Sequence, residues 1–183
     1  AHEGVRCVFC GSLYPTLREP DFTLELFTAL NAPDLTLTMA GRGWEPFEAA
    51  AQRAQGVLGA RFVRPGLLPP GKAAELESGA DILLSLGNAF DNQMPSKLFS
   101  YLGTGKPLLH LAVTDTDPTL PYLAKYPLAL VLHKKNGVTP EVVDTLRRWL
   151  TDVQGQCLPY AQVAALYPEF TPEVVAQTFI GRI

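Results

Sequence analysis

The sequence lacks an excess of basic residues, a long apolar run and the pattern of a secretory signal. Its net charge is −3 at neutral pH, which argues against general nucleic-acid binding because such proteins present a basic face. No apolar run approaches the ~20 residues of a membrane-spanning helix. The first residues, Ala-His-Glu-Gly, lack the basic and apolar regions of a signal peptide. We therefore expect no nucleic-acid partner, no membrane span and a cytoplasmic location, with membrane association only through another part of the protein.

Cysteine is also scarce, with three residues in all. Cys7 and Cys10 form a C-x-x-C, a spacing found in metal and redox sites. Both fall in one apolar run, where side chains three positions apart on a strand point to opposite faces. No second C-x-x-C or histidine pair supplies further ligands. We interpret them as structural cysteines in a reducing compartment, and we predict no metal site.

Apolar residues are abundant, at 47% of 183 residues, against 18% charged. This composition and length are typical of a soluble chain with one real core. No internal repeat, low-complexity run or linker divides the sequence, so we treat 1–183 as a single domain. The chain begins almost directly on an apolar run, and we expect it to be a piece of a longer protein.

Short apolar runs alternate with segments of helical periodicity, at intervals of roughly 20–25 residues. The predicted strands are 5–10, 35–40, 57–63, 82–86, 107–113 and 128–133. The predicted helices are 22–31, 46–55, 71–78, 95–102 and 140–153, and shorter helical patterns follow at 162–166 and 172–180. Thr139 is the expected cap of the helix 140–153, with Pro140 at its first position. This alternation predicts an α/β, Rossmann-like fold: a parallel sheet of about six strands with helices on both faces and a helical C-terminal tail.

Ligands of such sheets bind at the carboxyl ends of the strands, near the point where the strand order reverses. The loops that matter are therefore 11–20, 41–44, 64–70, 88–95 and 114–126. Gly11-Ser12 either lets the backbone approach a ligand or forms a simple turn. Arg18 either clamps a diphosphate or is solvated. Gly41-Arg42-Gly43 resembles half of a dinucleotide fingerprint, but the third glycine is missing.

The stretch 80–113 reads as strand, polar loop, helix and strand. Pro95 suits the first position of the helix. Capping chemistry explains Ser96 but not Lys97, because a cation in the first turn opposes the helix dipole. An anion such as phosphate between the helix and Lys97 accounts for that placement.

The remaining polar residues offer weaker candidates. Asp115 and Asp117 form a D-x-D, a pattern that holds a metal–diphosphate in some sugar transferases but that is also ordinary turn chemistry. His110 alternates with leucines and is expected to be buried or at a sheet edge. Glu75 and Glu77 are expected on an exposed helix face. No Ser/His/Asp or Cys/His grouping has a spacing that suggests catalysis.

Three segments carry a family resemblance. They are Asp81-Ile-Leu-Leu, then Asn92-Gln-Met-Pro-Ser-Lys-Leu-Phe99, and then Tyr101-Leu-Gly-Thr-Gly-Lys-Pro107. Together they resemble the donor-binding, C-terminal half of GT-B glycosyltransferases, with the closest likeness to the group-1 type that builds polysaccharides and other glycoconjugates. The rest of the chain follows the order of that family, but only the 88–107 motif is specific.

The resemblance implies a nucleoside-diphosphate sugar as donor substrate, no required cofactor, and an acceptor held by a missing N-terminal domain. It implies diphosphate binding by Gly11, Ser12, Arg18, Pro95, Ser96 and Lys97. It implies ribose, base or sugar contacts from Arg64, Gly66, Asn88, Asn92, Gln93 and Ser100. Many relatives carry two glutamates eight positions apart in this motif, where the present sequence has Asn92 and Ser100.

Catalysis is then expected to rest on electrostatic stabilisation of the leaving diphosphate. The catalytic residues are unknown, and the chain alone is expected to bind nucleotide weakly and to be inactive. Three alternatives stay open. The departure at Ser100 suggests a degenerate nucleotide-binding or regulatory module, Asp115 and Asp117 suggest a manganese-dependent transferase, and a protein-interaction domain on this fold is the third.

Overall fold

The computed structural model describes residues 4–91, 93–95 and 97–171, and all structural statements below concern these residues. Six parallel strands form one sheet in the order β3-β2-β1-β4-β5-β6. The strands are β1 (Val5–Cys10), β2 (Leu35–Ala40), β3 (Phe62–Val63), β4 (Ile82–Leu86), β5 (Leu108–Ala112) and β6 (Ala129–His133). The order reverses between β1 and β4, which makes this pair the switch point of the sheet.

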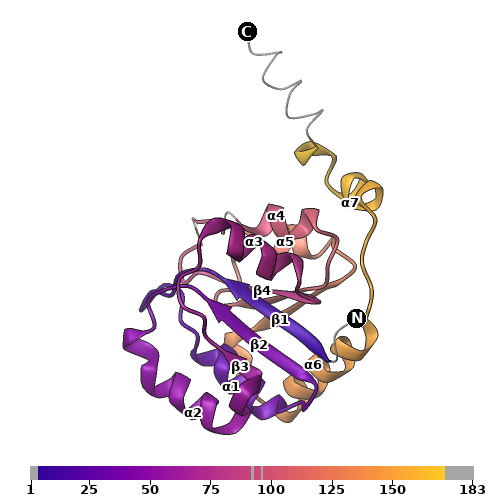
Figure 1. Ribbon diagram of the computed structural model, residues 1–183. Helices are drawn as coiled ribbons and strands as arrows, with labels where there is room; N and C mark the ends of the chain where they lie inside the picture. Colours follow the sequence, from indigo (N-terminus) through magenta and orange to yellow (C-terminus); the bar gives the residue numbers. More distant parts are fainter. Residues whose placement is uncertain (1–3, 92, 96, 172–183) are drawn as a thin grey trace.

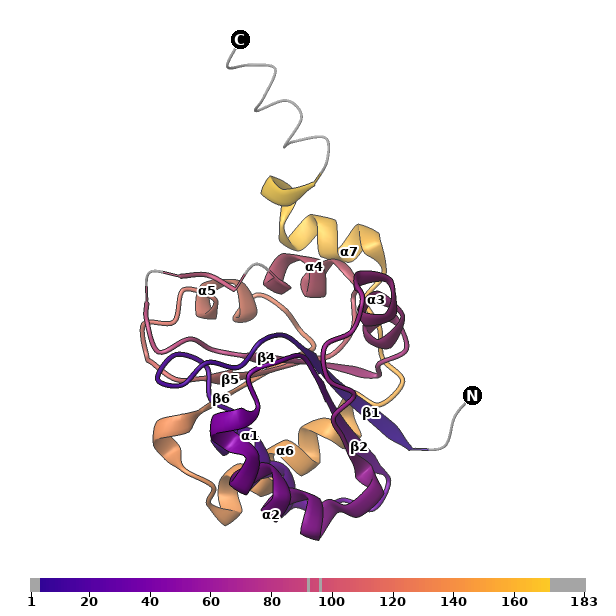
Figure 2. The same ribbon diagram turned by 60° about the vertical axis from the view of Figure 1, so that its left-hand side comes forward.

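Helices cover both faces of the sheet, as the alternating sequence pattern predicts. They are α1 (Asp21–Leu30), α2 (Glu48–Leu58), α3 (Pro70–Ser78), α4 (Lys97–Gly103), α5 (Leu120–Leu123), α6 (Pro140–Asp152) and α7 (Tyr160–Leu166). Figures 1 and 2 show α1, α2 and α6 on one face, and α3, α4 and α5 on the other, with α7 beside α4. The predicted Rossmann-like fold and helical tail are therefore confirmed.

The apolar strands are continuous because neither face of the sheet meets water. Every residue of β4 and β5 is buried. Side chains alternate between two clusters: Leu84 packs with α1 and α6, whereas Leu83 packs with α4 and α5. The same alternation places Cys7 and Cys10 in opposite clusters. Both are free thiols, which agrees with the structural interpretation of this pair.

The predicted third strand was wrong in its extent. Residues 57 and 58 belong to α2, and a 3-10 turn (Gly59–Arg61) follows before the two residues of β3. Leu58 is buried with Ala51 and Ala54, at the spacing of a helical face. The apolar residues before Gly59 therefore extend the helix, and the positive φ of Gly59 at +56° ends it.

Other predicted boundaries also differ from the structure. Helix α4 begins at Lys97, so Pro95 precedes the helix and does not open it. The predicted loop 114–126 contains the short helix α5. By contrast, Thr139 caps α6 as expected, since its side chain accepts a hydrogen bond from the Val142 N–H. The predicted helix 172–180 lies outside the described residues.

Candidate functional site

A cavity of about 190 Å³ opens at the switch point, where β1 and β4 end. It is lined by Phe9, Cys10, Gly11, Arg18, Leu84, Ser85, Leu86, Pro95, Lys97 and Tyr101. Four of the predicted diphosphate residues are thus brought together: Gly11, Arg18, Pro95 and Lys97. Segments more than 70 residues apart in the sequence meet here because their strands are neighbours in the sheet.

A tight loop after β1 places Arg18 beside this cavity. Tyr14 and Arg18 exchange backbone hydrogen bonds of 3.0 and 2.9 Å, and Thr16 takes a positive φ of 62° at the tip. The Ala89 N–H donates to the Leu17 carbonyl at 2.8 Å. This bond fastens the loop after β1 to the loop after β4, so the two strand ends present one surface.

The Arg18 side chain is half-buried and is held by an amide, not by a carboxylate. Its Nε and Nη2 donate to Asn88 Oδ1 at 3.1 and 2.7 Å, and Nη1 makes a long contact of 3.5 Å with the Ser12 carbonyl. Asn88 is itself buried and donates to the Gln93 carbonyl at 3.2 Å. In the described part of the chain, no carboxylate forms an ion pair with Arg18. Burial lowers the pKa of Arg18, and the nearby Tyr14 acts in the opposite direction.

Lys97 is different, because the fold supplies its counter-ion. Its Nζ donates to Glu77 Oε1, and the Tyr101 hydroxyl donates to the same oxygen at 2.8 Å. The expectation that Glu77 is exposed was wrong, since it is half-buried between α3 and α4. The anion that a lysine in the first turn seemed to require is therefore present within the protein. Burial and the Glu77 charge raise the pKa of Tyr101, and they raise that of Cys10 to about 12.

The Gly41-Arg42-Gly43 segment has a backbone role. A Cβ on Gly41, whose φ is +142°, would lie 1.7 Å from the Gly11 carbonyl oxygen, and one on Gly43 would lie 2.2 Å from the Leu13 carbonyl oxygen. The Leu13 N–H donates to the Arg42 carbonyl at 2.9 Å. The two glycines therefore let the loops after β1 and β2 lie in contact, and they shape the cavity only indirectly.

The other predicted binding residues lie apart from the cavity lining. Arg64 pairs with Glu48 at 2.8 Å and stacks over Trp44, and Gly66 accepts a backbone hydrogen bond at the same edge of the sheet. Ser100 is exposed and donates to the Lys97 carbonyl at 2.8 Å. The Gln93 side chain is exposed, and Ser12 contributes its carbonyl to Arg18. Asn92 and Ser96 fall outside the described residues.

The D-x-D residues point to separate partners. Asp115 is exposed and pairs with Lys135 at 2.5 Å, with His133 3.4 Å away. Asp117 is buried and accepts from His110 at 3.0 Å and from Thr119. This arrangement explains Asp117 as turn chemistry and gives no support to a shared metal site. No group of three or more potential metal-ligating side chains occurs in ranges 4–91, 93–95 and 97–171.

The buried grouping of Ser85, His110 and Asp117 was missed by sequence reasoning. His110 is fully buried, as expected, and lies between the other two side chains, 3.0 Å from each. Ser85 and His110 are direct partners in the β4–β5 register. A correct strand register is the signal that reveals this pair, whereas sequence spacing alone does not.

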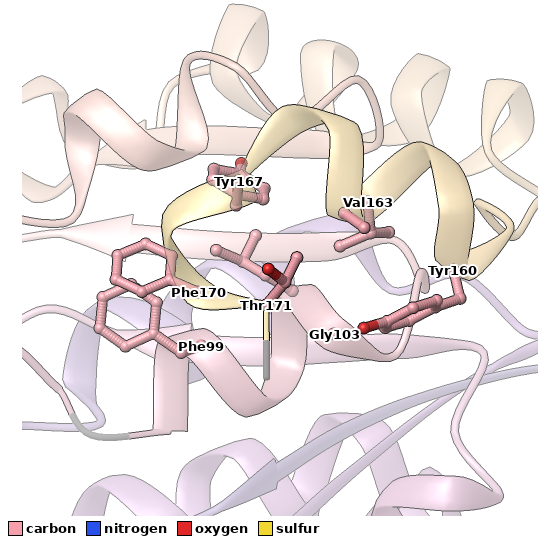
Figure 3. Close-up of a pocket in the computed structure, with 9 residues that line it drawn as sticks. Phe99, Gly103, Tyr160, Val163, Tyr167, Phe170 and Thr171 are labelled. Carbon is pink, nitrogen blue, oxygen red and sulfur yellow. The ribbon is translucent and has the colours of Figure 1, made fainter. Parts of the chain in front are cut away.

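A second cavity, of about 80 Å³, lies between α4 and α7. Figure 3 shows Val163 on α7, Tyr167 just after its end, and Phe99 and Phe170 beside each other. These two rings have centroids 4.3 Å apart. The lining contains hydroxyl groups but no charged side chain, so this cavity is an apolar packing site and unsuited to a diphosphate.

No helix in the described part of the chain is long and apolar enough to cross a membrane.

The sequence matches no protein-family model and no curated protein. Its fold, however, matches solved glycosyltransferases. AviGT4, a glycosyltransferase involved in avilamycin A biosynthesis, aligns over 100% of this chain and 51% of its own, with 16% identity and a TM-score of 0.62. MurG of Acinetobacter baumannii aligns over 100% and 50%, with 16% identity and a TM-score of 0.62. The lipopolysaccharide outer core galactosyltransferase WaaB aligns over 97% and 48%, with 16% identity and a TM-score of 0.61.

This chain spans about half the length of the solved structures that it matches. At 16% identity the likeness establishes the fold. The resemblance drawn from the 81–107 segments is confirmed at that level, since the chain has the fold of one half of these glycosyltransferases.

Proposed function

We propose that this chain is the donor-binding, C-terminal half of a two-domain glycosyltransferase and holds a nucleoside-diphosphate sugar at the switch-point cavity. A second domain, outside this sequence, holds the acceptor. The fold supports this proposal, because glycosyltransferases of twice the length contain it as one half. The observation that carries it is Arg18, a half-buried cation without a carboxylate partner in the described residues, fixed at the mouth of the cavity by Asn88.

An uncompensated guanidinium next to a cavity is suited to an anion of more than one oxygen. Its planar fork matches phosphate geometry, and its desolvation strengthens the interaction with an arriving charge. Asn88 holds the fork in place before the ligand binds, so little side-chain entropy remains to be lost. During transfer the same cation stabilises the negative charge that develops on the departing diphosphate.

Lys97 has a secondary role in this proposal. Its charge is balanced by Glu77 in the free protein. Lys97 therefore contributes to diphosphate binding only if its ammonium group moves away from that carboxylate. Arg64 and Gly66, at the neighbouring edge of the sheet, remain candidates for the base, and Gln93 and Ser100 for the sugar or ribose. The chain alone is expected to bind nucleotide and to transfer nothing.

Titration calorimetry with UDP, GDP and ADP in turn tests the proposal. One of them should bind, and Arg18→Gln should weaken that binding ~10- to 100-fold, as expected for a lost charge-assisted interaction. Arg148→Gln, on α6 at the opposite face, is the matched control and should bind like the wild type. Absence of binding by all three nucleotides, or equal binding by Arg18→Gln, would contradict the proposal.

A catalytically inactive nucleotide-binding module is the second candidate. Ser100 favours it, because its hydroxyl is already bonded to a main-chain carbonyl and it supplies no carboxylate. Nucleotide binding by this chain, combined with no sugar transfer by the full-length protein in the presence of acceptor, would select the module over the enzyme.

A further inference from the structure

Three buried polar side chains form a row that begins at the cavity wall and runs inward. Ser85, on β4, lines the cavity and is only 7% exposed. Its Oγ lies 3.0 Å from Nδ1 of His110 on β5, and Nε2 of that ring lies 3.0 Å from Asp117 Oδ2. The chain of contacts therefore runs from the cavity to a carboxylate inside the protein.

The proton positions along this chain follow from its inner end. Burial alone would raise the pKa of Asp117, but hydrogen bonds from His110 and Thr119 outweigh it and hold the pKa below its ordinary value. The carboxylate is thus ionised and can only accept. Its Oδ1 accepts from the Thr119 N–H at 2.9 Å and from the Thr119 hydroxyl at 2.7 Å. The donor to the other carboxylate oxygen, Oδ2, must therefore be the Nε2–H group of His110.

When the ring carries a single proton, on Nε2, its Nδ1 is bare and can only accept. The Ser85 hydroxyl is then committed as a donor to that nitrogen. The hydroxyl oxygen still has a free lone pair, so Ser85 can accept a hydrogen bond from a ligand in the cavity but cannot donate one.

We propose that Ser85 Oγ accepts a hydrogen bond from a hydroxyl group of the bound ligand and so determines which part of the ligand occupies this wall of the cavity. The inference rests on the proposed function and concerns the orientation of the donor. A diphosphate oxygen is also an acceptor and is disfavoured against Ser85. A ribose or hexose hydroxyl is favoured there, and the diphosphate faces Arg18. Asp117 and His110 act as positioning residues that fix the direction of the Ser85 hydroxyl.

The grouping is not arranged as a hydrolytic triad. Its serine contacts Nδ1 and its carboxylate contacts Nε2, the reverse of the order in serine proteases. Ser85 lies within β4 and not on an exposed turn, and the ring of His110 is 0% exposed. A reacting carbonyl therefore has no route to the base.

Calorimetry on Ser85→Ala separates the two kinds of ligand group. Inorganic pyrophosphate should bind within twofold of the wild type, whereas the nucleoside diphosphate that the wild type prefers, or its glucose conjugate, should bind ~5- to 10-fold more weakly. A loss with the nucleoside diphosphate assigns the contact to ribose, and a loss confined to the conjugate assigns it to the hexose. Thr38→Ala removes a buried hydroxyl of β2 outside the cavity lining and should change neither affinity.

Equal weakening of pyrophosphate, or no weakening of any ligand, would overturn the inference while leaving the proposed function intact. A wild-type protein that binds none of the nucleotides would overturn both. The wild-type protein also gives a test that needs no variant of Ser85. Long-range ¹H–¹⁵N spectra should show a proton on Nε2 of His110 and none on Nδ1, and a proton on Nδ1 would refute the proposed orientation.

Discussion

Replacing Lys106 with methionine is expected to destabilise the protein by ~2–3 kcal/mol. The Lys106 ammonium reaches the end of α3 and donates to the carbonyl of Glu77 at 3.2 Å, to that of Ala80 at 2.6 Å and to that of Ser78. These carbonyls lie at or just beyond the C-terminus of the helix, where helical hydrogen bonding ends, although the Glu77 carbonyl also accepts from the Ala80 N–H at 3.2 Å. Methionine keeps the apolar stem but leaves the three oxygens without this donor.

The magnitude follows from two opposing contributions. A hydrogen bond from a charged group contributes ~1.5–3 kcal/mol, and three bonds to one ammonium are far from additive. Burial lowers the pKa of Lys106, which shows that part of the gain is offset by desolvation of the cation. The net loss is therefore comparable to one strong bond, not to three.

Urea denaturation followed by circular dichroism measures this loss, and the melting temperature should fall by ~2–4 °C per kcal/mol for a chain of this size. Lys72→Met is the matched control: Lys72 lies on α3 itself and makes an exposed pair with Glu75, which contributes at most ~0.5 kcal/mol. A Lys106→Met variant as stable as the control would refute this account of how α3 ends.

Further predictions concern the loops and the cavity. Gly41→Ala should lower the free energy of unfolding in urea by at least ~2 kcal/mol, because the position has a positive φ and the added Cβ would lie 1.7 Å from a carbonyl oxygen. Gly103→Ala is the control: no atom lies within 4 Å of its added Cβ, so stability should be unchanged or higher. Asp117→Asn should cost ~2–3 kcal/mol at pH 7. The pKa of Asp117 in the folded protein is depressed below its ordinary value of 3.8. The stability that the carboxylate contributes is therefore fully present above pH 3.8 and is lost as the pH falls through the folded-state pKa. A variant whose acid unfolding profile equals that of the wild type would contradict this. Glu77→Gln should raise the affinity for the preferred nucleoside diphosphate ~3- to 10-fold in calorimetry, because it removes a negative charge beside Lys97. An unchanged or lower affinity would show that Glu77 positions the lysine instead.

The fold could be predicted where the sequence signal is local. The apolar run of β4, bounded by a polar loop, and the Thr139-Pro140 start of α6 are each specified by neighbouring residues. The third strand was misassigned because residues 57 and 58 are apolar and fit either a strand or the buried face of α2. Short apolar runs next to a glycine carry this ambiguity whenever the helix before them is rich in alanine.

The site was harder to predict because its contacts join distant segments. Arg18 and Lys97 were both identified, but their difference lies in their partners: Asn88 for the first and Glu77 for the second. The pairing of Lys97 depends on how α3 lies against α4, which no local pattern specifies. Ser85 was passed over for the same reason, since its importance appears only when β5 is placed beside β4.

A crystal structure of this chain with the nucleoside diphosphate that calorimetry selects tests the central claim most directly. The account predicts the diphosphate between the ends of β1 and β4, with its oxygens within hydrogen-bonding distance of the Arg18 guanidinium. A diphosphate bound elsewhere, with Arg18 still bonded to Asn88 and Ser12 alone, would contradict it.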